Sequence, residues 1–206
     1  MIHEIDESLR RLISTEALAD GSAEVVFDAP SRDWAARRNS PTIDAYLYDI
    51  REELARRERG AAAVRDPNGI VLSRRRQPRW FRLSYLVTAW TRQPEDEHRL
   101  LSAVLGALLA HEILPPDSLP AAVAAITTAV PLSIAVPPAE SRSLADIWSA
   151  LGGELKPSLD VVVLTPFPVT PEFPAAPPVT HQPDLDLRDR SHDPPVVTGT
   201  PTLGPR

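Results

Sequence analysis

The sequence predicts an α+β domain with a mixed, mostly antiparallel sheet and helices packed on it, followed by an extended proline-rich C-terminal arm. The main evidence lies between Arg79 and Pro115, where a strand pattern gives way to a helix pattern. From Arg79 to Thr91, aromatic and β-branched residues occupy both faces of a period-two alternation, which is typical of a central strand. Pro94 suits the first position of a helix, and a broad apolar stripe follows it. This stripe consists of Leu100, Leu101, Val104, Leu105, Leu108 and Leu109.

The N-terminal part of the chain predicts one helix and two strands. Apolar residues recur at spacings of three and four from about Ile2 to Leu18, which indicates an amphipathic helix. A short strand is expected from Ala23 to Asp28, and the polar segment after it is predicted to be a loop that carries Trp34. Thr42 to Ile50 is the second strand. Because this strand and the central strand are apolar on both faces, one face of the sheet is expected to be buried by another subunit.

An arginine-rich excursion separates the second strand from the central strand. It runs from Glu52 to Gln77 and contains the turn sequence Asp66-Pro67-Asn68-Gly69. Asn-Gly is a strong signal for a two-residue hairpin turn. We therefore expect a hairpin between two long antiparallel strands.

The elements after the central pair are shorter. A helical piece is expected around Leu119 to Ile126, and a strand from Leu132 to Val136. Ser143 is placed to cap a helix that continues to Leu151. The last strand, Ser158 to Thr165, is a nearly continuous β-branched run, which is typical of a buried position.

Length and proline content predict the domain organisation. The 206 residues are enough for one domain of about 150 residues plus an appendage. Of the 23 prolines, 11 lie between Pro166 and Pro205, where the hydrophobic periodicity is also lost. We therefore predict an α+β domain at residues 1–165 and an extended, semi-rigid arm at residues 166–206.

Composition excludes several classes of function. The chain has no cysteine, so disulfides, thiolate metal sites and cysteine nucleophiles are excluded. The first residues are acidic and amphipathic, unlike a secretory signal, and the longest apolar run is shorter than the roughly 20 residues a membrane-spanning helix needs. The net charge of −6 argues against a dedicated nucleic-acid binder. We expect assembly in the cytoplasm, no contact with membrane or nucleic acid, and release, if any, by lysis.

The sequence also lacks the common signatures of catalysis and of cofactor binding. There is no GxGxxG, GxxxxGK[ST], HExxH or GxSxG. The nearest metal-like spacing is His3 with Glu7, or His98 beside Glu97, and solvated helix faces explain both pairs. No catalytic residue, cofactor or metal site is predicted, and the chain is not expected to be an enzyme.

A basic segment and one aromatic residue are candidates for partner binding. Residues 51–82 contain ten arginines and four acidic residues, a local balance of +6. This segment is either a docking patch for an acidic partner or the solvated face of an edge hairpin. Trp34 is a further candidate, because it stands alone in a polar segment. The candidate arginines are Arg74, Arg75, Arg76, Arg79 and Arg82.

Four segments, taken in order, resemble the N-terminal domain of the tail-terminator or cap proteins of bacterial contractile injection systems, which are phage-tail-like particles. They are Asn39 to Glu53, Trp80 to Thr91, Pro94 to Pro115 and Ile147 to Val163. The most specific pieces are YLYDIRE, SYLVTAW followed by PEDEHRLL, and the WSALGG…KPSL ending. The resemblance covers about residues 1–168. It weakens over Arg56 to Arg76 and does not extend to the arm.

The resemblance implies a structural role rather than catalysis. Proteins of this family form a ring, expected to be a homo-hexamer, on the last ring of the inner-tube protein. The ring ends growth of the tube and of the sheath at the end of the particle away from the baseplate. We expect the arm to hold the sheath protein, with Val196 and Val197 in a β-prone segment, residues 195–200, that adds a strand to a sheath subunit.

Two alternatives remain open from the sequence. One is another structural adaptor of the same particle, at the baseplate or linked to the sheath. The other is an unrelated oligomeric binding module whose arginine patch holds an acidic protein or a nucleic acid, which salt-sensitive DNA binding would favour.

Overall fold

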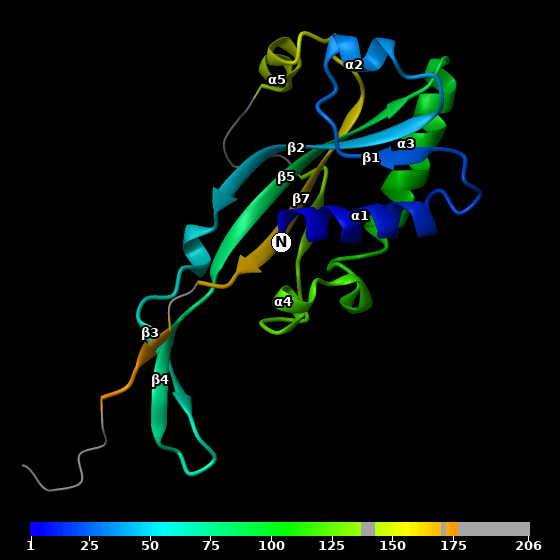
Figure 1. Ribbon diagram of the computed structural model, residues 1–206. Helices are drawn as coiled ribbons and strands as arrows, with labels where there is room; N and C mark the ends of the chain where they lie inside the picture. The colour runs from blue at the N-terminus through cyan, green and yellow to red at the C-terminus, as the bar shows by residue number, and fades with distance from the viewer. Residues whose placement is uncertain (137–142, 170–171, 177–206) are drawn as a thin grey trace, which may run out of the picture.

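The structure is a computed structural model of the chain, and it describes residues 1–136, 143–169 and 172–176. Two sheets organise it (Figure 1): a five-stranded sheet in the order β1-β2-β5-β7-β6 and a three-stranded sheet in the order β3-β4-β8. The strands are β1 (Glu24–Val26), β2 (Thr42–Glu52), β3 (Ala61–Arg65), β4 (Val71–Arg76), β5 (Arg79–Trp90), β6 (Leu132–Ile134), β7 (Ser158–Phe167) and β8 (Glu172–Pro174). The helices are α1 (Ile2–Glu16), α2 (Arg32–Ala36), α3 (Pro94–Leu109), α4 (Ala121–Ala124) and α5 (Leu144–Ala150), with short 3-10 helices η1 (Leu54–Arg56) and η2 (Pro116–Ser118).

The predicted fold class is confirmed, because β1 pairs in parallel with β2 and the remaining pairings are antiparallel. As the sequence predicted, β5 is the central strand of the larger sheet, with β2 on one side and β7 on the other. Its residues 83–89 are all buried. Burial on both faces explains why aromatic and β-branched residues occupy both alternations of this strand.

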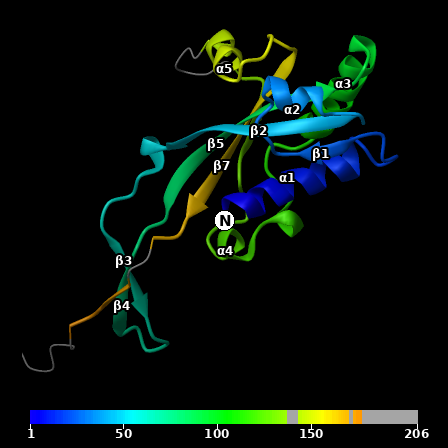
Figure 2. The ribbon, with the colours of Figure 1, turned by 45° about the horizontal axis from the view of Figure 1, so that its top comes forward.

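One face of the larger sheet is covered by α1 and α3 (Figures 1 and 2). Tyr85 of β5 points towards this layer, and its hydroxyl donates a hydrogen bond of 2.7 Å to Asp6 Oδ1 on α1. The predicted apolar stripe of α3 is confirmed at Leu101, Val104 and Leu108, which are buried. It is wrong at Leu109, which is 63% exposed at the end of the helix. The core side chains supplied by the two helices are Ile5, Leu9, Leu12, Ile13, Leu101, Val104 and Leu108.

Among the described residues, cover on the opposite face of the sheet is confined to one end. There α2 and α5 lie over the sheet (Figure 2), and three tryptophans pack in series. The ring centroids of Trp34 and Trp90 are 5.3 Å apart in an edge-to-face arrangement, and those of Trp90 and Trp148 are 6.4 Å apart. We call the uncovered remainder of this face the open half-face, and we define it by Trp80, Arg82, Val162 and Leu164.

The sequence predicted a loop around Trp34. This prediction is wrong, because the helix α2 forms there. Ser31 caps the helix: its side-chain oxygen accepts a hydrogen bond of 3.3 Å from the backbone N–H of Trp34. A helix of five residues is too short to show a hydrophobic period, so only the capping serine indicated it.

The predicted hairpin is confirmed as β3 and β4, which project beyond the larger sheet (Figure 1). Gly69 in its turn has φ +84°, a left-handed conformation that glycine adopts without strain. A third strand, β8, pairs with β4 and was not predicted, because Pro174 and the surrounding prolines indicated an extended, semi-rigid arm. Proline is tolerated here because β8 lies at the edge of its sheet.

Candidate partner interface

The predicted arginine patch spans the hairpin and the start of β5, and cross-strand carboxylates neutralise its β5 part. Arg79 Nε donates a hydrogen bond of 2.7 Å to Glu52 Oε1 on β2. Arg82 NH1 lies 3.3 Å from Glu53 Oε2. The hydrogen bond from Arg79, followed by the charge of Arg57, lowers the pKa of Glu52. These two arginines are therefore paired within the chain rather than free to meet an acidic partner.

The three arginines of β4 point in two directions. Arg75 lies on one face of the small sheet, where its NH2 group is 3.2 Å from Glu172 Oε2 on β8. Arg76 lies on the other face, with its guanidinium 5.6 Å from the ring centroid of Phe173. Arg74 shares that face and has no ion pair with any described residue. Among the five candidate arginines, Arg74 therefore has the charge that is most available to a partner.

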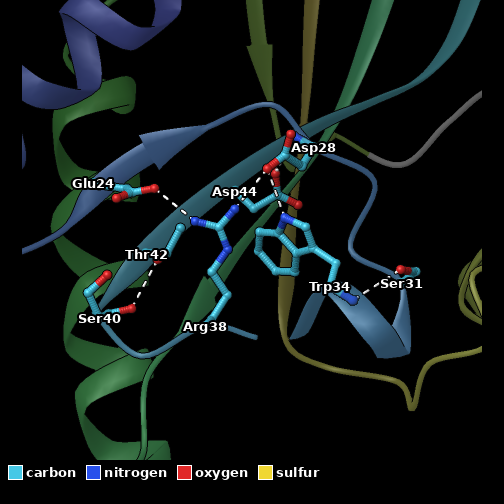
Figure 3. A network of polar contacts seen from close by, with 8 residues as sticks. All are labelled: Glu24, Asp28, Ser31, Trp34, Arg38, Ser40, Thr42 and Asp44. Atoms are coloured by element: carbon cyan, nitrogen blue, oxygen red, sulfur yellow. Dashed lines mark hydrogen bonds and ion pairs between the residues drawn. The ribbon is translucent and has the colours of Figure 1, made fainter. Parts of the chain in front are cut away.

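Trp34 is placed in the domain interior, where it is 7% exposed. Its indole N–H donates a hydrogen bond of 2.8 Å to Asp28 Oδ2 (Figure 3). The same oxygen accepts a bond of 2.9 Å from Arg38, whose other nitrogen reaches Glu24 at 2.8 Å. The Arg38 guanidinium also stacks 4.4 Å above the Trp34 ring. Little of the Trp34 ring is exposed to a partner, because the Arg38 side chain covers it at the surface.

A buried carboxyl group, Asp44, lies beneath this network. Its Oδ1 accepts a hydrogen bond of 3.0 Å from the backbone N–H of Asp28, and its Oδ2 is buried without a described partner. Burial, reinforced by the nearby charge of Asp28, raises the pKa of Asp44 to about 8. The sequence did not indicate that Asp44 is buried, because polar residues on strands are ordinarily exposed.

The open half-face is the other surface that sequence reasoning did not locate. Trp80, Val162 and Leu164 are partly exposed on it, and Arg56 lies 4.6 Å above the Trp80 ring. At its border, Tyr48 donates a hydrogen bond of 2.8 Å to Asp160 Oδ1. Burial, followed by the contact with Asp160, raises the pKa of Tyr48 to about 12. This surface combines apolar area with fixed polar groups, as protein interfaces commonly do.

One edge of the larger sheet is also free over most of its length. β1 pairs with β2 only at residues 42–44, so residues 45–52 pair with β5 alone among the described strands. The register of this pairing shifts between Leu47 and Asp49, a bulge of the kind that limits uncontrolled pairing at an edge. The free edge adjoins the open half-face.

The remaining candidates, Val196 and Val197, lie outside the described residues. Within the described part of the chain, no group of three or more potential ligands is placed to hold a metal ion. Over the same residues, no helix is both long enough and apolar enough to cross a bilayer.

Comparison with known proteins gives the family. The sequence profile of the Pvc16 N-terminal domain family matches residues 4–181, which is most of the chain. The chain belongs to the Pvc16 N-terminal domain family. A search of curated protein sequences gives no match. The resemblance to tail-terminator and cap proteins predicted from the four sequence segments is confirmed.

Two solved structures share the fold of this chain. The sheath/tube terminator of PVC, an extracellular contractile injection system, in its extended state aligns with a TM-score of 0.69 at 23% identity, over 93% of this chain and 65% of its own. The tube-terminating cap of the anti-feeding prophage aligns with a TM-score of 0.61 at 21% identity, over 88% of this chain and 60% of its own. The chain thus spans less than two thirds of the length of either protein.

The raised pKa of the buried Asp44 carboxyl group predicts that the stability of the chain depends on pH. The pKa of Asp44 is higher in the folded chain than its ordinary value near 3.8, so folding favours the protonated form. The contribution of Asp44 to stability is therefore full below about pH 4, falls as pH rises, and is lost once pH passes about 8. We expect Asp44→Asn, which keeps the hydrogen-bond acceptor, to remove this dependence and to be more stable than wild type at pH 9 by a few kcal/mol, at about 1.4 kcal/mol per pKa unit.

Urea unfolding at pH 5, 7 and 9 measures this effect. The control is Asp33→Asn, an exposed aspartate on the neighbouring α2 helix, whose pH profile should follow wild type. Parallel pH profiles for wild type and Asp44→Asn would contradict the assignment of a protonated carboxyl group.

Proposed function

We propose that the chain is a structural cap of a contractile injection system, which ends polymerisation of the inner tube and of the sheath. The observation that carries this proposal is family membership over residues 4–181, together with a fold shared with a sheath/tube terminator over 93% of the chain. Two proteins that share the fold are a terminator and a cap, which favours a structural role over catalysis.

We infer that the cap is a closed ring of identical subunits, most simply a hexamer seated on the last ring of the inner tube. In such a ring each subunit contacts its neighbours through two different surfaces, because the contact is head to tail. The open half-face and the adjoining free edge of β2 supply one such surface, with partly exposed Trp80, Val162 and Leu164. The partners of the cap subunit are further copies of the chain and the tube protein.

The two sides of the domain differ in a way that suits a terminator. In the described structure, α1 and α3 pack on one side of the larger sheet, and the other side keeps the open half-face. A ring built from such subunits has two unlike faces. One can match the tube, while the other presents no surface to which a further tube ring could add. Growth therefore stops through a mismatch in shape rather than through a reaction.

The cellular setting belongs to the same proposal. We propose that the chain assembles in the cytoplasm as part of the particle, without contact with membrane or nucleic acid, and leaves the cell only if the particle is released by lysis. The pairing of Arg79 and Arg82 with Glu52 and Glu53 supports the absence of nucleic-acid contact alone, because charges paired within the chain are less available to phosphates.

Imaging particles assembled with and without this chain tests the capping role. Without the chain we expect tubes of irregular or excessive length, because no ring ends their growth. A labelled chain in complete particles should appear at the end away from the baseplate. Uniform tube length in its absence would overturn the proposal, and a label at the baseplate would instead support the alternative of another structural adaptor.

The C-terminal arm is the proposed link to the sheath. We propose that the segment at residues 195–200, which includes Val196 and Val197, adds a strand to a sheath subunit through main-chain hydrogen bonds. A chain truncated after Pro168 should still cap tubes, but the sheath should detach or shorten, as electron microscopy of extended particles would show. Particles with anchored, full-length sheaths on the truncated chain would exclude this role for the arm.

A further inference from the structure

The projecting hairpin depends on a strand from outside it. A two-stranded hairpin is marginally stable in water, and a third strand or a packed helix is normally needed. β3 and β4 have no helix against them in the described structure, and the third strand is β8 (Figure 1). β8 comes from the first part of the segment predicted to be an extended arm.

The pairing between β4 and β8 is regular. Ser73, Arg74 and Arg75 lie opposite Pro174, Phe173 and Glu172 in antiparallel register. Just beyond the strand, the backbone N–H of Ala175 donates a hydrogen bond of 3.1 Å to the carbonyl oxygen of Leu72. The backbone contact therefore continues for one residue past β8.

Side chains hold the pairing on both faces of the small sheet. On one face the Glu172 carboxylate accepts a hydrogen bond from the Ser73 hydroxyl and pairs with Arg75 at 3.2 Å. The Ser73 bond first, and then the bond from Arg75, lower the pKa of Glu172. On the other face, the Arg76 guanidinium lies over the Phe173 ring. Glu172 and Phe173, the acidic and aromatic residues of β8, thus each have a matching partner on β4.

We propose that the β3–β4 hairpin is a docking site for the first residues of the C-terminal segment of its own chain, and that the contact of Glu172 with Ser73 and Arg75 is its latch. The arginine-rich composition of the hairpin then has a specific use. Arg75 and Arg76 bind residues of β8 rather than a separate acidic partner.

The docking also sets the direction in which β8 runs. β4 runs from the hairpin turn towards the larger sheet, and β8 is antiparallel to it, so β8 runs towards the turn. The backbone contact ends at Leu72, close to the turn and away from the larger sheet. β8 and the backbone contact that follows it therefore run along the hairpin away from the larger sheet, which on the proposed function is towards the sheath.

Charge reversal in the full-length chain tests the latch. Glu172→Arg and Arg75→Glu each place like charges opposite one another, and the double variant restores an attractive pair. We expect each single variant to raise amide hydrogen exchange in peptides covering 172–176 and 71–76 by about two- to fivefold, the size expected for an exposed charged pair. The double variant should return to within about twofold of wild type.

Arg74→Glu is the matched control, because it makes the same charge change on the same strand without removing an ion pair to a described residue. It should change exchange by less than about twofold. Unchanged exchange in both single variants would overturn the latch, as would a double variant no better than the worse single variant. An effect of Arg74→Glu equal to that of Arg75→Glu would also overturn it.

This experiment is independent of capping. It uses the isolated full-length chain, and the main sheet, whose core does not include the hairpin, provides an internal reference for exchange. If tubes prove to be uncapped by this chain, the latch result still stands. If the latch fails, the capping proposal is unaffected.

Discussion

Burial of the central strand on both faces is the constraint on which the rest of the domain depends. Tyr85 and its alternate neighbours on β5 pack against α1 and α3, while Leu86 and Thr88 are buried on the opposite side. Neither layer alone covers the strand. The two helices cover the core part of one face, whereas in the described structure α2, α5 and the stacked tryptophans cover one end of the other. The open half-face follows directly from this unequal cover, and so does the difference between the two sides of the molecule.

That difference connects the fold to the proposed role. A terminator needs no reacting group. It needs one surface that fits a polymer end and another that offers no continuation. The domain has a helix-covered side, an open half-face bordered by the free edge of β2, and a hairpin that projects beyond the sheet. The hairpin pairs with β8 and so holds this short strand beyond the larger sheet.

Much of the fold could be predicted from local sequence, and the reasons for the failures are physical. β5 and α3 were predictable because a long strand and a long helix each repeat their period several times. The α2 helix and β8 are too short to show a period, and the prolines around Pro174 favoured an extended arm. The arginine patch looked free because its partners, Glu52, Glu53 and Glu172, lie across strands rather than beside the arginines in sequence. The burial of Trp34 depends in the same way on contacts with distant residues.

The most direct test of the account is to mix the purified full-length chain with polymerised inner tubes of its own particle and to image the tube ends by cryo-electron microscopy. The account predicts a ring of this chain on one end of each tube, and no further elongation from that end when tube protein is added. A chain that stays monomeric, leaves both ends bare and does not affect elongation would contradict it.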